Sequence, residues 1–488
     1  MNIKKISDFI VNLEKTVPVN EIKYRKIHLW PIIRGYIYGS LLFDDQNQKP
    51  STPEKKDGTW LSRFKSKIFH QKIAIKEVKK QHFEGETDFL FWSRTIDHSD
   101  KVDGLPYSRH TDPYFELFNE QFKCRKLEIG PKIKRKVKTT FLPNWITMVP
   151  DHNEIRLDHI SKRTLNLINN EFSEYSSNAI PSSFISSKIL KILNLSKIFK
   201  EVLKKISPNA VFIVCYHDEN TFAVILACNE LNIPTIEVQH GQQGIYNSLY
   251  CRWTNMPRDG YSLLPHYCWM WGEKSKENVL AGRNDNQTNP IPIVGGNRWL
   301  FKKISQEIDL IEDSFIQRLK ECQVVTIATQ PFSNIDLLIP DFVYNVINKF
   351  PLGIQWLVKL HPNQLNQTDE ITSFIKQKID NRNILVQEIS NYALYDILEV
   401  TNFLITQWSS VIYECQLFNN IPIVVSETGK ELFSKKIEDG YFLYAKDESS
   451  LTEIFKTEHN LPVDAEPYIK HDDRTARIAM NRLVEFTN

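Results

Sequence analysis

Short, continuously apolar segments recur along this 488-residue chain, and most of them are followed by a polar loop. A first series comprises residues 88–92, 210–216, 234–238 and 292–294. A second series comprises residues 323–328, 355–360, 383–386, 402–406 and 421–425. Apolar strands that alternate with helical segments are typical of parallel sheets covered by helices on both faces. The sequence therefore predicts an α/β protein with two Rossmann-like, doubly wound domains that face each other across a ligand cleft.

This pattern and its interruptions predict the domain organisation. Residues 1–84 are expected to form a helical and linker segment that packs on the first domain, residues 85–297. Residues 298–320 are mostly charged and helical, and they are expected to connect to the second domain, residues 321–460. The last segment, residues 461–488, is expected to be a helix that crosses back to the first domain.

Several classes of protein are excluded at this stage. No apolar run approaches the ~20 residues that a membrane-spanning helix needs. The first ten residues lack the apolar core of a signal peptide, which predicts a cytoplasmic protein. The seven cysteines are scattered without a C-x-x-C pair, so a disulfide framework or a zinc ribbon is not expected.

The net charge of +2 is unevenly distributed along the chain. Residues 54–80, 122–139 and 188–205 carry net charges of +6, +7 and +5. Such runs are commonly solvated faces; alternatively they attract an anionic membrane leaflet, a charged glycan or a nucleic acid. No nucleic acid partner is expected, because no zinc-finger or RNA-recognition signature accompanies the basic runs.

The N-terminal segment 25–42 has partly helical apolar spacing, and Pro31 suits the first turn of a helix. Two interpretations stay open: a helix packed on the protein, or a helix in a membrane interface that uses Trp30, Tyr36 and Tyr38. The polar residues 46–58 are expected to form a linker.

Ser409 and Ser410 follow the strand 402–406 and precede a helix predicted for residues 411–417. A helix N-terminus carries free amide groups and a partial positive charge, and two hydroxyls add further donors. The sequence therefore predicts a phosphate site here, although one serine alone is also an ordinary helix cap.

A second cluster follows the strand 355–360. Lys359 ends this strand, and Pro362 fixes the backbone after His361. We expect His361 to lie near Ser409 and Ser410, where an imidazolium stabilises and protonates a departing nucleotide phosphate; a His-Pro turn without function is the alternative.

Further residues are expected to line the donor pocket. Glu414 lies four residues after Ser410 on the same helical face and is a candidate for ribose hydroxyls. Gln330 and Pro362 lie in the loops after two predicted strands and are candidates for the nucleotide.

In the first domain, the strand 234–238 runs into a loop with two glycines that permit close approach of a ligand. Glu237 and His240 are the best candidates for a general base, and strand alternation leaves Glu237 facing either the core or the sheet edge. His217, Asp218 and Gly241 are expected on the same acceptor side.

These motifs resemble those of GT-B glycosyltransferases, in particular bacterial capsule and lipopolysaccharide enzymes with a His-Pro motif and a paired-serine motif. Bacterial sialyltransferases and Kdo transferases, which use CMP-activated sugars, have both. The resemblance implies that Lys359, His361, Ser409 and Ser410 bind the donor phosphate. Residues 29–31 and 237–241 are also similar to segments of surface-polysaccharide biosynthesis proteins. The two acids and glycine that supply the base in sialyltransferases are replaced here by residues 237–241.

Three hypotheses about function follow. The first is a metal-independent glycosyltransferase without cofactor, with a nucleotide-sugar donor, most simply a CMP-sugar, and a glycan or lipid-linked glycan acceptor at the inner face of the cytoplasmic membrane. The second is a CDP-glycerol or CDP-ribitol phosphotransferase, whose motifs are similar around residues 359–362 and 409–414. The third is a non-catalytic member of a polysaccharide assembly complex. A Walker-type phosphate loop and an Asp-x-Asp pair are absent from the sequence, so an ATPase is not expected.

Overall fold

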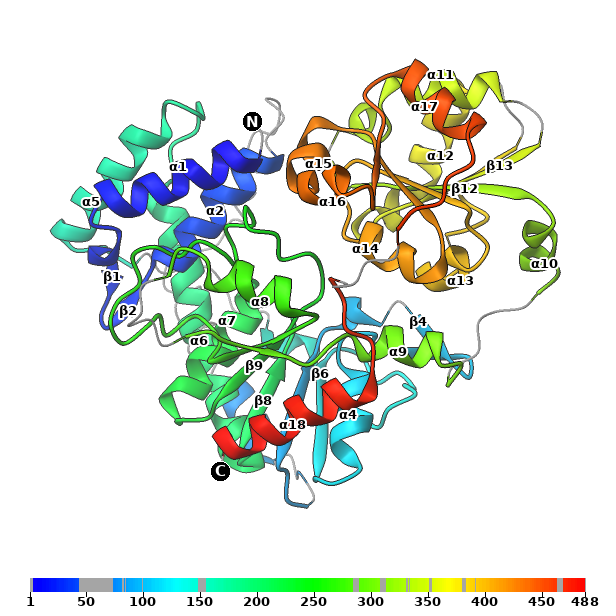
Figure 1. The fold of residues 1–488 in the computed structure, drawn as a ribbon. Helices are drawn as coiled ribbons and strands as arrows, with labels where there is room; N and C mark the ends of the chain where they lie inside the picture. The colour runs from blue at the N-terminus through cyan, green and yellow to red at the C-terminus, as the bar shows by residue number, and fades with distance from the viewer. Residues whose placement is uncertain are drawn as a thin grey trace. The chain divides into compact units, whose positions relative to one another are not determined.

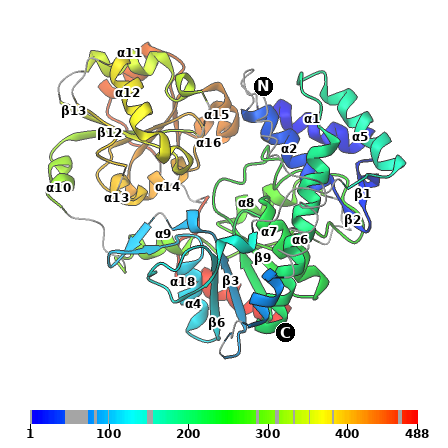
Figure 2. The same ribbon diagram turned by 180° about the vertical axis from the view of Figure 1, so that it is seen from behind.

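The computed structural model forms two compact units, which Figures 1 and 2 show from opposite sides. The first unit comprises residues 1–299 and 470–488, and the second comprises residues 300–469. The structure describes residues 3–43, 73–80, 83, 85–98, 100–147, 155–283, 289–307, 313–330, 332, 334–350, 353–379, 383–390, 392–462 and 468–487. The linker predicted for residues 46–58 and most of the basic run 54–80 lie outside these ranges.

The first unit is built on a seven-stranded parallel sheet in the order β11-β10-β9-β8-β3-β6-β7. Its strands are β3 (Phe89–Ser93), β6 (Cys124–Ile129), β7 (Thr139–Leu142), β8 (Ala210–Ile213), β9 (Thr235–Val238), β10 (Tyr267–Met270) and β11 (Ile291–Val294). Every residue of β3, β8 and β9 is buried, as expected for strands covered on both faces.

Helices cover this sheet, and one of them comes from the end of the chain. They are α4 (Asp112–Asn119), α6 (Ser182–Ile206), α7 (Glu219–Glu230), α8 (Glu273–Leu280), the start of α9 (Arg298–Ile304) and α18 (Asp473–Thr487). A further helix, α5 (His159–Phe172), packs on the N-terminal segment instead, where Phe172 stacks on Phe9. Met480 and Leu483 of α18 share one apolar cluster with Phe118 of α4 and Phe212 of β8. The chain therefore returns to its first unit after completing the second.

The N-terminal segment consists of α1 (Ile3–Thr16), η1 (Val19–Glu21), the short strands β1 (Lys23–Tyr24) and β2 (Ile27–His28), and α2 (Trp30–Phe43). Residues 73–80 are also helical. Trp30 and Tyr38 of α2 are 0% and 5% exposed, and the ring of Tyr36 lies 4.6 Å from that of Phe184. The interpretation as a packed helix is therefore correct, because the aromatic rings that a membrane interface would need are turned into the protein.

The second unit holds a six-stranded parallel sheet in the order β14-β13-β12-β15-β16-β17. Its strands are β12 (Gln323–Ala328), β13 (Ile354–Lys359), β14 (Ile384–Leu385), β15 (Phe403–Thr406), β16 (Ile421–Val424) and β17 (Leu443–Tyr444). Its helices are α10 (Ser314–Lys320), η4 (Ile335–Leu337), α11 (Asp341–Lys349), η5 (Pro362–Gln367), α12 (Thr368–Lys378), α13 (Leu394–Leu398), α14 (Val411–Cys415), η6 (Gln416–Phe418), α15 (Glu427–Leu432), α16 (Ser434–Glu438) and α17 (Glu448–Lys456).

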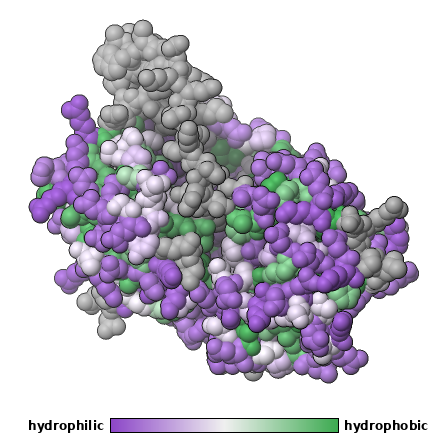
Figure 3. Space-filling view, turned by 90° about the horizontal axis from the view of Figure 1, so that it is seen from above, coloured by the Kyte–Doolittle hydropathy of each residue, from purple (hydrophilic) through white to green (hydrophobic). Residues whose placement is uncertain are grey.

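The predicted fold class, an α/β protein with two doubly wound parallel sheets, is confirmed. Each sheet has its own apolar core, and Trp356 and Val358 of β13 belong to the core of the second. On the face drawn in Figure 3, apolar side chains reach the surface as patches among hydrophilic ones. Within the described ranges, no helix is both long and apolar enough to cross a membrane.

Candidate functional site

Each sheet contains one point at which the order of its strands reverses along the chain. In the second sheet it lies between β12 and β15, and in the first sheet between β3 and β8. Ligands of open α/β sheets bind outside the carboxyl ends of the strands at such a point. The two sets of predicted site residues follow these strands and their neighbours, so each unit has one candidate edge.

The edge of the second unit, here called the His361 edge, carries Gln330 after β12, His361 after β13, and Ser409 and Ser410 after β15. Because β12 lies between β13 and β15, two strand spacings, or ~10 Å, separate the His361 and Ser409 positions. Among the described residues, no hydrogen bond joins them. The structure therefore places both dipeptides after strands of one sheet, at the same edge and without a contact between them; a shared phosphate site stays a prediction.

The His361 ring is held by the turn that Pro362 begins. Its Nδ1 accepts a hydrogen bond from the Asn363 amide at 3.2 Å, and its own amide donates to Thr329 Oγ1 at 3.0 Å. Burial lowers the pKa of His361 to about 4. The ring is therefore neutral at pH 7, with Nδ1 as acceptor and the proton on Nε2. This differs from the imidazolium expected from the sequence, because the surrounding protein disfavours the charged form.

Thr406, the last residue of β15, organises the middle of this edge. Its Oγ1 accepts hydrogen bonds from Gln330 Nε2 at 3.3 Å and from the Ser409 amide at 3.1 Å, and it donates to the Ala328 carbonyl at 3.1 Å. Gln330 is 6% exposed. The Thr406 hydroxyl thus holds both the Gln330 side chain and the backbone at Ser409, where the paired serines begin.

Ser409 and Ser410 lead into α14, which continues directly as η6. Ser409 Oγ accepts from the Val411 amide at 3.4 Å, which is a capping role. Within the part of the chain that the structure describes, the Ser410 hydroxyl makes no capping hydrogen bond. Ser410 is half-buried, and both hydroxyls keep their own protons, since Ser409 Oγ only accepts.

Of three other predicted donor residues, two have structural partners and the third is exposed. Lys359 Nζ donates to the carbonyls of Tyr392 and Ile389 at 2.6 and 3.3 Å. Glu414 is 5% exposed and accepts a 2.5 Å hydrogen bond from Tyr395. Pro362 is exposed at the start of η5. A phosphate role for Lys359 and nucleotide roles for Glu414 and Pro362 stay predictions.

The edge of the first unit, here called the His240 edge, lies where β9, β8 and β3 end. Glu237 and His240 come from β9 and its following loop, His217 and Asp218 follow β8, and Arg94 follows β3. These three strands are neighbours in the sheet. The predicted acceptor-side residues are therefore brought together, and Arg94 joins them.

Glu237 is fully buried, which settles the orientation that strand alternation left open. Its Oε1 accepts hydrogen bonds from the Tyr250 hydroxyl at 3.0 Å and the Tyr216 amide at 3.3 Å, whereas Oε2 has no partner among the described residues. Burial raises the pKa of Glu237 to about 8. Tyr216, Glu237 and Tyr250 also line a small internal cavity together with Cys268.

His240 lies beside the buried Glu237 and is partly exposed at the surface. Its side chain is 26% exposed, and its Nδ1 lies 3.9 Å from Glu237 Oε1. The centres of the His110 and His217 rings lie 6.1 and 6.5 Å from the centre of the His240 ring. Burial, followed by the charge of Arg94, lowers the pKa of His240 to about 3. The ring is therefore a neutral imidazole with a buried carboxyl group behind it.

Asp218 caps the start of α7. Its Oδ1 accepts from the amides of Asn220 and Thr221 at 2.9 and 3.0 Å, and its Oδ2 lies 3.5 Å from Arg94 Nη1. Arg94 also contacts Asp97 at 2.6 Å. Because the Asp218 carboxylate is engaged on all these sides, its contribution to an acceptor would be to hold Arg94 and the start of α7.

His217 and Gly241 complete the predicted acceptor side. His217 Nε2 lies 3.2 Å from Cys215 Sγ, and burial lowers the pKa of His217 to about 4. Cys215 has a φ of 59°, in the left-handed region, so the chain turns sharply after β8. The Gly241 carbonyl accepts a 2.9 Å hydrogen bond from Gln239, which closes the loop after β9.

Sequence reasoning missed Arg94, His110 and Tyr250 as members of the His240 edge. Arg94 follows the predicted strand 88–92, so the rule that found His361, a polar residue after a strand, could have found it. His110 and Tyr250 lie in irregular segments, and only the folded chain brings them to this edge. Among the described residues, no three His, Cys, Asp or Glu side chains are arranged to hold a metal ion.

Comparison with protein families connects the His361 edge to a known group. Residues 344–484 match the family model described as CDP-Glycerol:Poly(glycerophosphate) glycerophosphotransferase. The matched region contains His361, Ser409 and Ser410 but not Gln330 or the His240 edge. A comparison with curated proteins gives no match.

Solved structures of similar fold cover most of the chain. A protein from Listeria monocytogenes named as a putative UDP-N-acetylglucosamine 2-epimerase is 14% identical, with 82% of this chain and 97% of that chain covered and a TM-score of 0.51. The UDP-GlcNAc 2-epimerase from Neisseria meningitidis, bound to UDP-GlcNAc, is 15% identical, with 82% and 100% covered and a TM-score of 0.48. A variant of the wall teichoic acid polymerase TagF is 10% identical, with 88% and 98% covered and a TM-score of 0.46. At 14% sequence identity, the Listeria structure shows that this chain shares a fold of GT-B type, and it shows nothing about the substrates of this chain.

Proposed function

We propose that this chain transfers a polyol phosphate from a CDP-activated donor, of the CDP-glycerol or CDP-ribitol type, to a hydroxyl acceptor. The observation that carries the proposal is the match of residues 344–484 to a glycerophosphotransferase family, since this region contains His361 and the paired serines. This was the second hypothesis from the sequence. It replaces CMP-sugar transfer as the preferred one, because the matching family model describes a phosphotransferase.

The His361 edge is proposed to bind the donor diphosphate. His361 Nε2–H and the hydroxyls of Ser409 and Ser410 are the proposed donors to phosphate oxygens. Nδ1 of His361 is occupied by the Asn363 amide, whereas Ser409 Oγ only accepts from the Val411 amide and keeps its own proton to donate. Gln330, held by Thr406, is proposed to line the nucleotide side. Charge that develops on the leaving CMP is stabilised by these fixed dipoles.

The His240 edge is proposed to activate the acceptor. His240 is the partly exposed base. The buried Glu237, which keeps its proton at neutral pH, lies 3.9 Å from His240 Nδ1 and is proposed to hold the ring in position. In the step, the acceptor oxygen forms a bond to the phosphorus that carries the polyol. The bond from that phosphorus to the CMP oxygen breaks, CMP leaves, and the acceptor proton moves to His240. The product is a phosphodiester.

The acceptor and the location of the enzyme are further parts of the proposal. A polyol-phosphate or glycan chain of the bacterial surface is the proposed acceptor, and the reaction is proposed to run in the cytoplasm without a metal or cofactor. Peripheral contact with an anionic membrane stays a prediction from the basic runs. Lys132 and Lys134, which are exposed in the loop after β6, are candidates for such a contact.

The test is a donor profile of the full chain with CDP-glycerol, CDP-ribitol, CMP-sugars and UDP-GlcNAc. We expect release of CMP only with the CDP-polyols, together with a new phosphodiester signal in the ³¹P NMR spectrum of the product. His361→Ala and Ser410→Ala should reduce the rate by ~100-fold or more, as loss of one transition-state donor does. Ser373→Ala, on α12, is the matched control and should leave the rate unchanged.

Other outcomes would select the remaining hypotheses. Release of CMP from a CMP-sugar, with no phosphorus in the product, would replace the proposal with glycosyl transfer. Failure to bind any nucleotide in a thermal-shift screen would favour the non-catalytic member of an assembly complex.

A further inference from the structure

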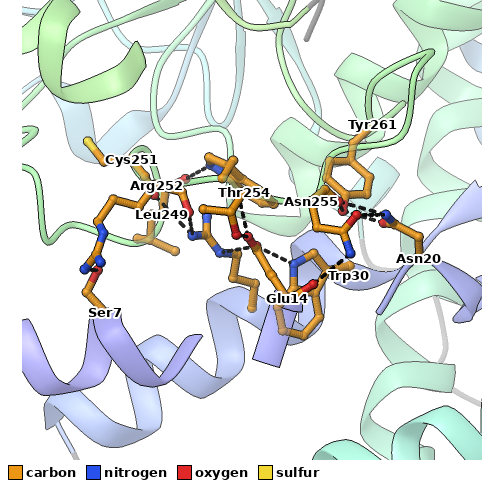
Figure 4. Close-up of polar contacts among 12 residues, drawn as sticks. Ser7, Glu14, Asn20, Trp30, Leu249, Cys251, Arg252, Thr254, Asn255 and Tyr261 are labelled. Atoms are coloured by element: carbon orange, nitrogen blue, oxygen red, sulfur yellow. Dashed lines mark hydrogen bonds and ion pairs between the residues drawn. The ribbon is translucent and has the colours of Figure 1, made fainter. Parts of the chain in front are cut away.

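The N-terminal helix pair, α1 and α2, holds a loop of the first unit through a buried ion pair. Arg34 of α2 and Glu14 of α1 are each 1% exposed in their side chains, and Arg34 Nε lies 3.2 Å from Glu14 Oε1. Trp30 donates to the same Glu14 oxygen at 2.9 Å. Figure 4 shows Glu14 between the helices and the loop that contains Thr254.

Both members of the ion pair bind the backbone of residues 251–254. Arg34 Nη2 donates to the carbonyls of Cys251 and Arg252 at 3.1 and 3.0 Å. Glu14 Oε2 accepts from the amide and the hydroxyl of Thr254, both at 2.7 Å. The guanidinium of Arg34 also lies 3.9 Å from the centre of the Trp253 ring, a cation–π contact. The loop is therefore held by hydrogen bonds from Arg34, by hydrogen bonds to Glu14 and by this ring contact.

The same loop carries a side chain of the His240 edge. Tyr250 precedes the residues that Arg34 binds, and its hydroxyl donates to Glu237 Oε1 at 3.0 Å. The neighbouring Leu249 carbonyl accepts from Trp253 Nε1 at 3.3 Å and from the Tyr216 hydroxyl. A shift of residues 251–254 would therefore move Tyr250 relative to Glu237.

We propose that Arg34 and Glu14 are positioning residues that fix residues 249–254 and thereby hold the Tyr250 hydroxyl on Glu237. The expected effect on the reaction rate rests on the proposed function, in which Glu237 supports His240 as the base. The expected effect on the contact between Tyr250 and Glu237 does not depend on that function. In this arrangement α1 and α2, which lie outside the sheet, are part of the machinery of the His240 edge.

The variant that tests the inference is Arg34→Met, which keeps an apolar side chain over Trp253 but removes the charge and the donors. Because removal of Arg34 leaves Glu14 unpaired in the core, which is destabilising, the neutral pair Glu14→Gln with Arg34→Met is the second variant. The matched control is Arg252→Ala. It removes the more exposed contact of the same helix and loop, Arg252 Nη1 to Asp8 at 2.6 Å.

Two readouts need no substrate. Hydrogen exchange of residues 249–255 should be faster in Arg34→Met, or in the neutral pair, and unchanged in Arg252→Ala. The Glu237 carboxyl, followed by ¹³C NMR, should titrate at higher pH, because the Tyr250 hydrogen bond favours the charged form. Tyr250→Phe should move that titration in the same direction. The other ionisable groups that face Glu237 are Arg94, Cys215, Tyr216, His240 and Cys268, and none of them is substituted in these variants.

The kinetic readout is a double-mutant cycle with Tyr250→Phe. Arg34→Met is expected to lower kcat by about 10-fold or more, as a displaced catalytic group does, and to leave the KM for the nucleotide donor unchanged. Combined with Tyr250→Phe, the loss should equal the larger single loss, because both act through one contact.

The results separate the two proposals. If the wild-type chain transfers nothing from any donor, the proposed function fails, and the exchange and titration experiments still decide the inference. A folded Arg34→Met variant with wild-type exchange and an unchanged Glu237 titration would overturn the inference. Multiplicative losses in the cycle would likewise overturn it, since they assign Arg34 a structural role independent of Tyr250.

Discussion

Burial sets the protonation of the side chains at both candidate edges. It lowers the pKa of His361 and His217 to about 4 and that of His240 to about 3, and it raises the pKa of Glu237 to about 8. At neutral pH the chain therefore presents neutral imidazoles that can take or share protons. A phosphate ligand beside His361 would raise its pKa again, because an anion favours the imidazolium.

Glu237 should make the stability of the first unit depend on pH. Its pKa rises from an ordinary 4.5 to about 8 on folding, so between these values the folded state holds a proton that the unfolded state has lost. Its contribution is therefore full below about pH 4.5 and is lost as the pH rises to about 8. At about 1.4 kcal/mol for each pH unit between the two pKa values, the loss approaches ~5 kcal/mol.

Urea unfolding of wild type and Glu237→Gln between pH 4.5 and 9 measures this contribution. We expect the variant to match wild type at acid pH and to be the more stable protein at pH 9. Glu273→Gln, on the exposed side of α8, is the control and should follow wild type throughout. A constant difference between Glu237→Gln and wild type across this range would show that Glu237 ionises normally in the folded protein.

At the scale of elements, the loop of the paired serines depends on α15. Ser426 Oγ donates to the Gln407 carbonyl at 2.8 Å and accepts from the Gly429 amide at 3.0 Å. A Cβ on Gly429 would lie 1.8 Å from the Gln407 carbonyl oxygen. Only glycine permits this approach, which brings α15 against the residues that lead into Ser409 and Ser410.

Gly429→Ala is therefore expected to displace residues 407–410 and to weaken nucleotide binding by about 10-fold or more, as a small displacement of binding groups does. Calorimetric titration with CMP measures the effect, and circular dichroism checks that the fold is retained. Gly39→Ala in α2 is the matched control, since its Cβ would meet no atom within 4 Å. Unchanged affinity in a folded Gly429→Ala variant would separate the serine loop from nucleotide binding.

The basic run 188–205 shows how a charge pattern changes meaning in the folded chain. It lies on α6, where Lys188 and Lys191 pair with Glu219 of α7, and Lys200 pairs with Glu230 at 2.7 Å. This run therefore serves the packing of α6 on α7 more than the attraction of an anionic surface. The sequence could not reveal this, because the pairing acids lie on another helix.

The elements that the sequence predicted best are the strands of continuous apolar character, such as β8, β12 and β15. Polar residues at their ends were predictable for the same reason, since parallel strands end at a common edge. β10 was missed although it is as long as β8 and β15. It follows the long irregular segment 239–266, and its place is fixed by pairing with β9 and β11. Tyr250 was missed because its contact with Glu237 depends on a loop that α1 and α2 hold.

At the scale of the whole molecule, the chain passes from the first unit to the second after Trp299 and returns at Lys470. The return anchors α18 in the core of the first unit, where Met480 and Leu483 are fully buried. Each unit thus has a complete sheet, a separate apolar core and its own candidate edge. A ligand of the His361 edge should accordingly stabilise the second unit more than the first.

Hydrogen exchange with and without CMP tests this division. At ~100-fold its dissociation constant, CMP should stabilise the state that binds it by about 2.7 kcal/mol. We expect protection to concentrate on residues 328–330, 359–364 and 406–415, with β8 and β9 exchanging as in the free protein. Ser410→Ala should reduce the protection, whereas Ser373→Ala should retain it. Protection centred instead on the His240 edge would assign the nucleotide to the first unit and reverse the proposed roles of the two edges.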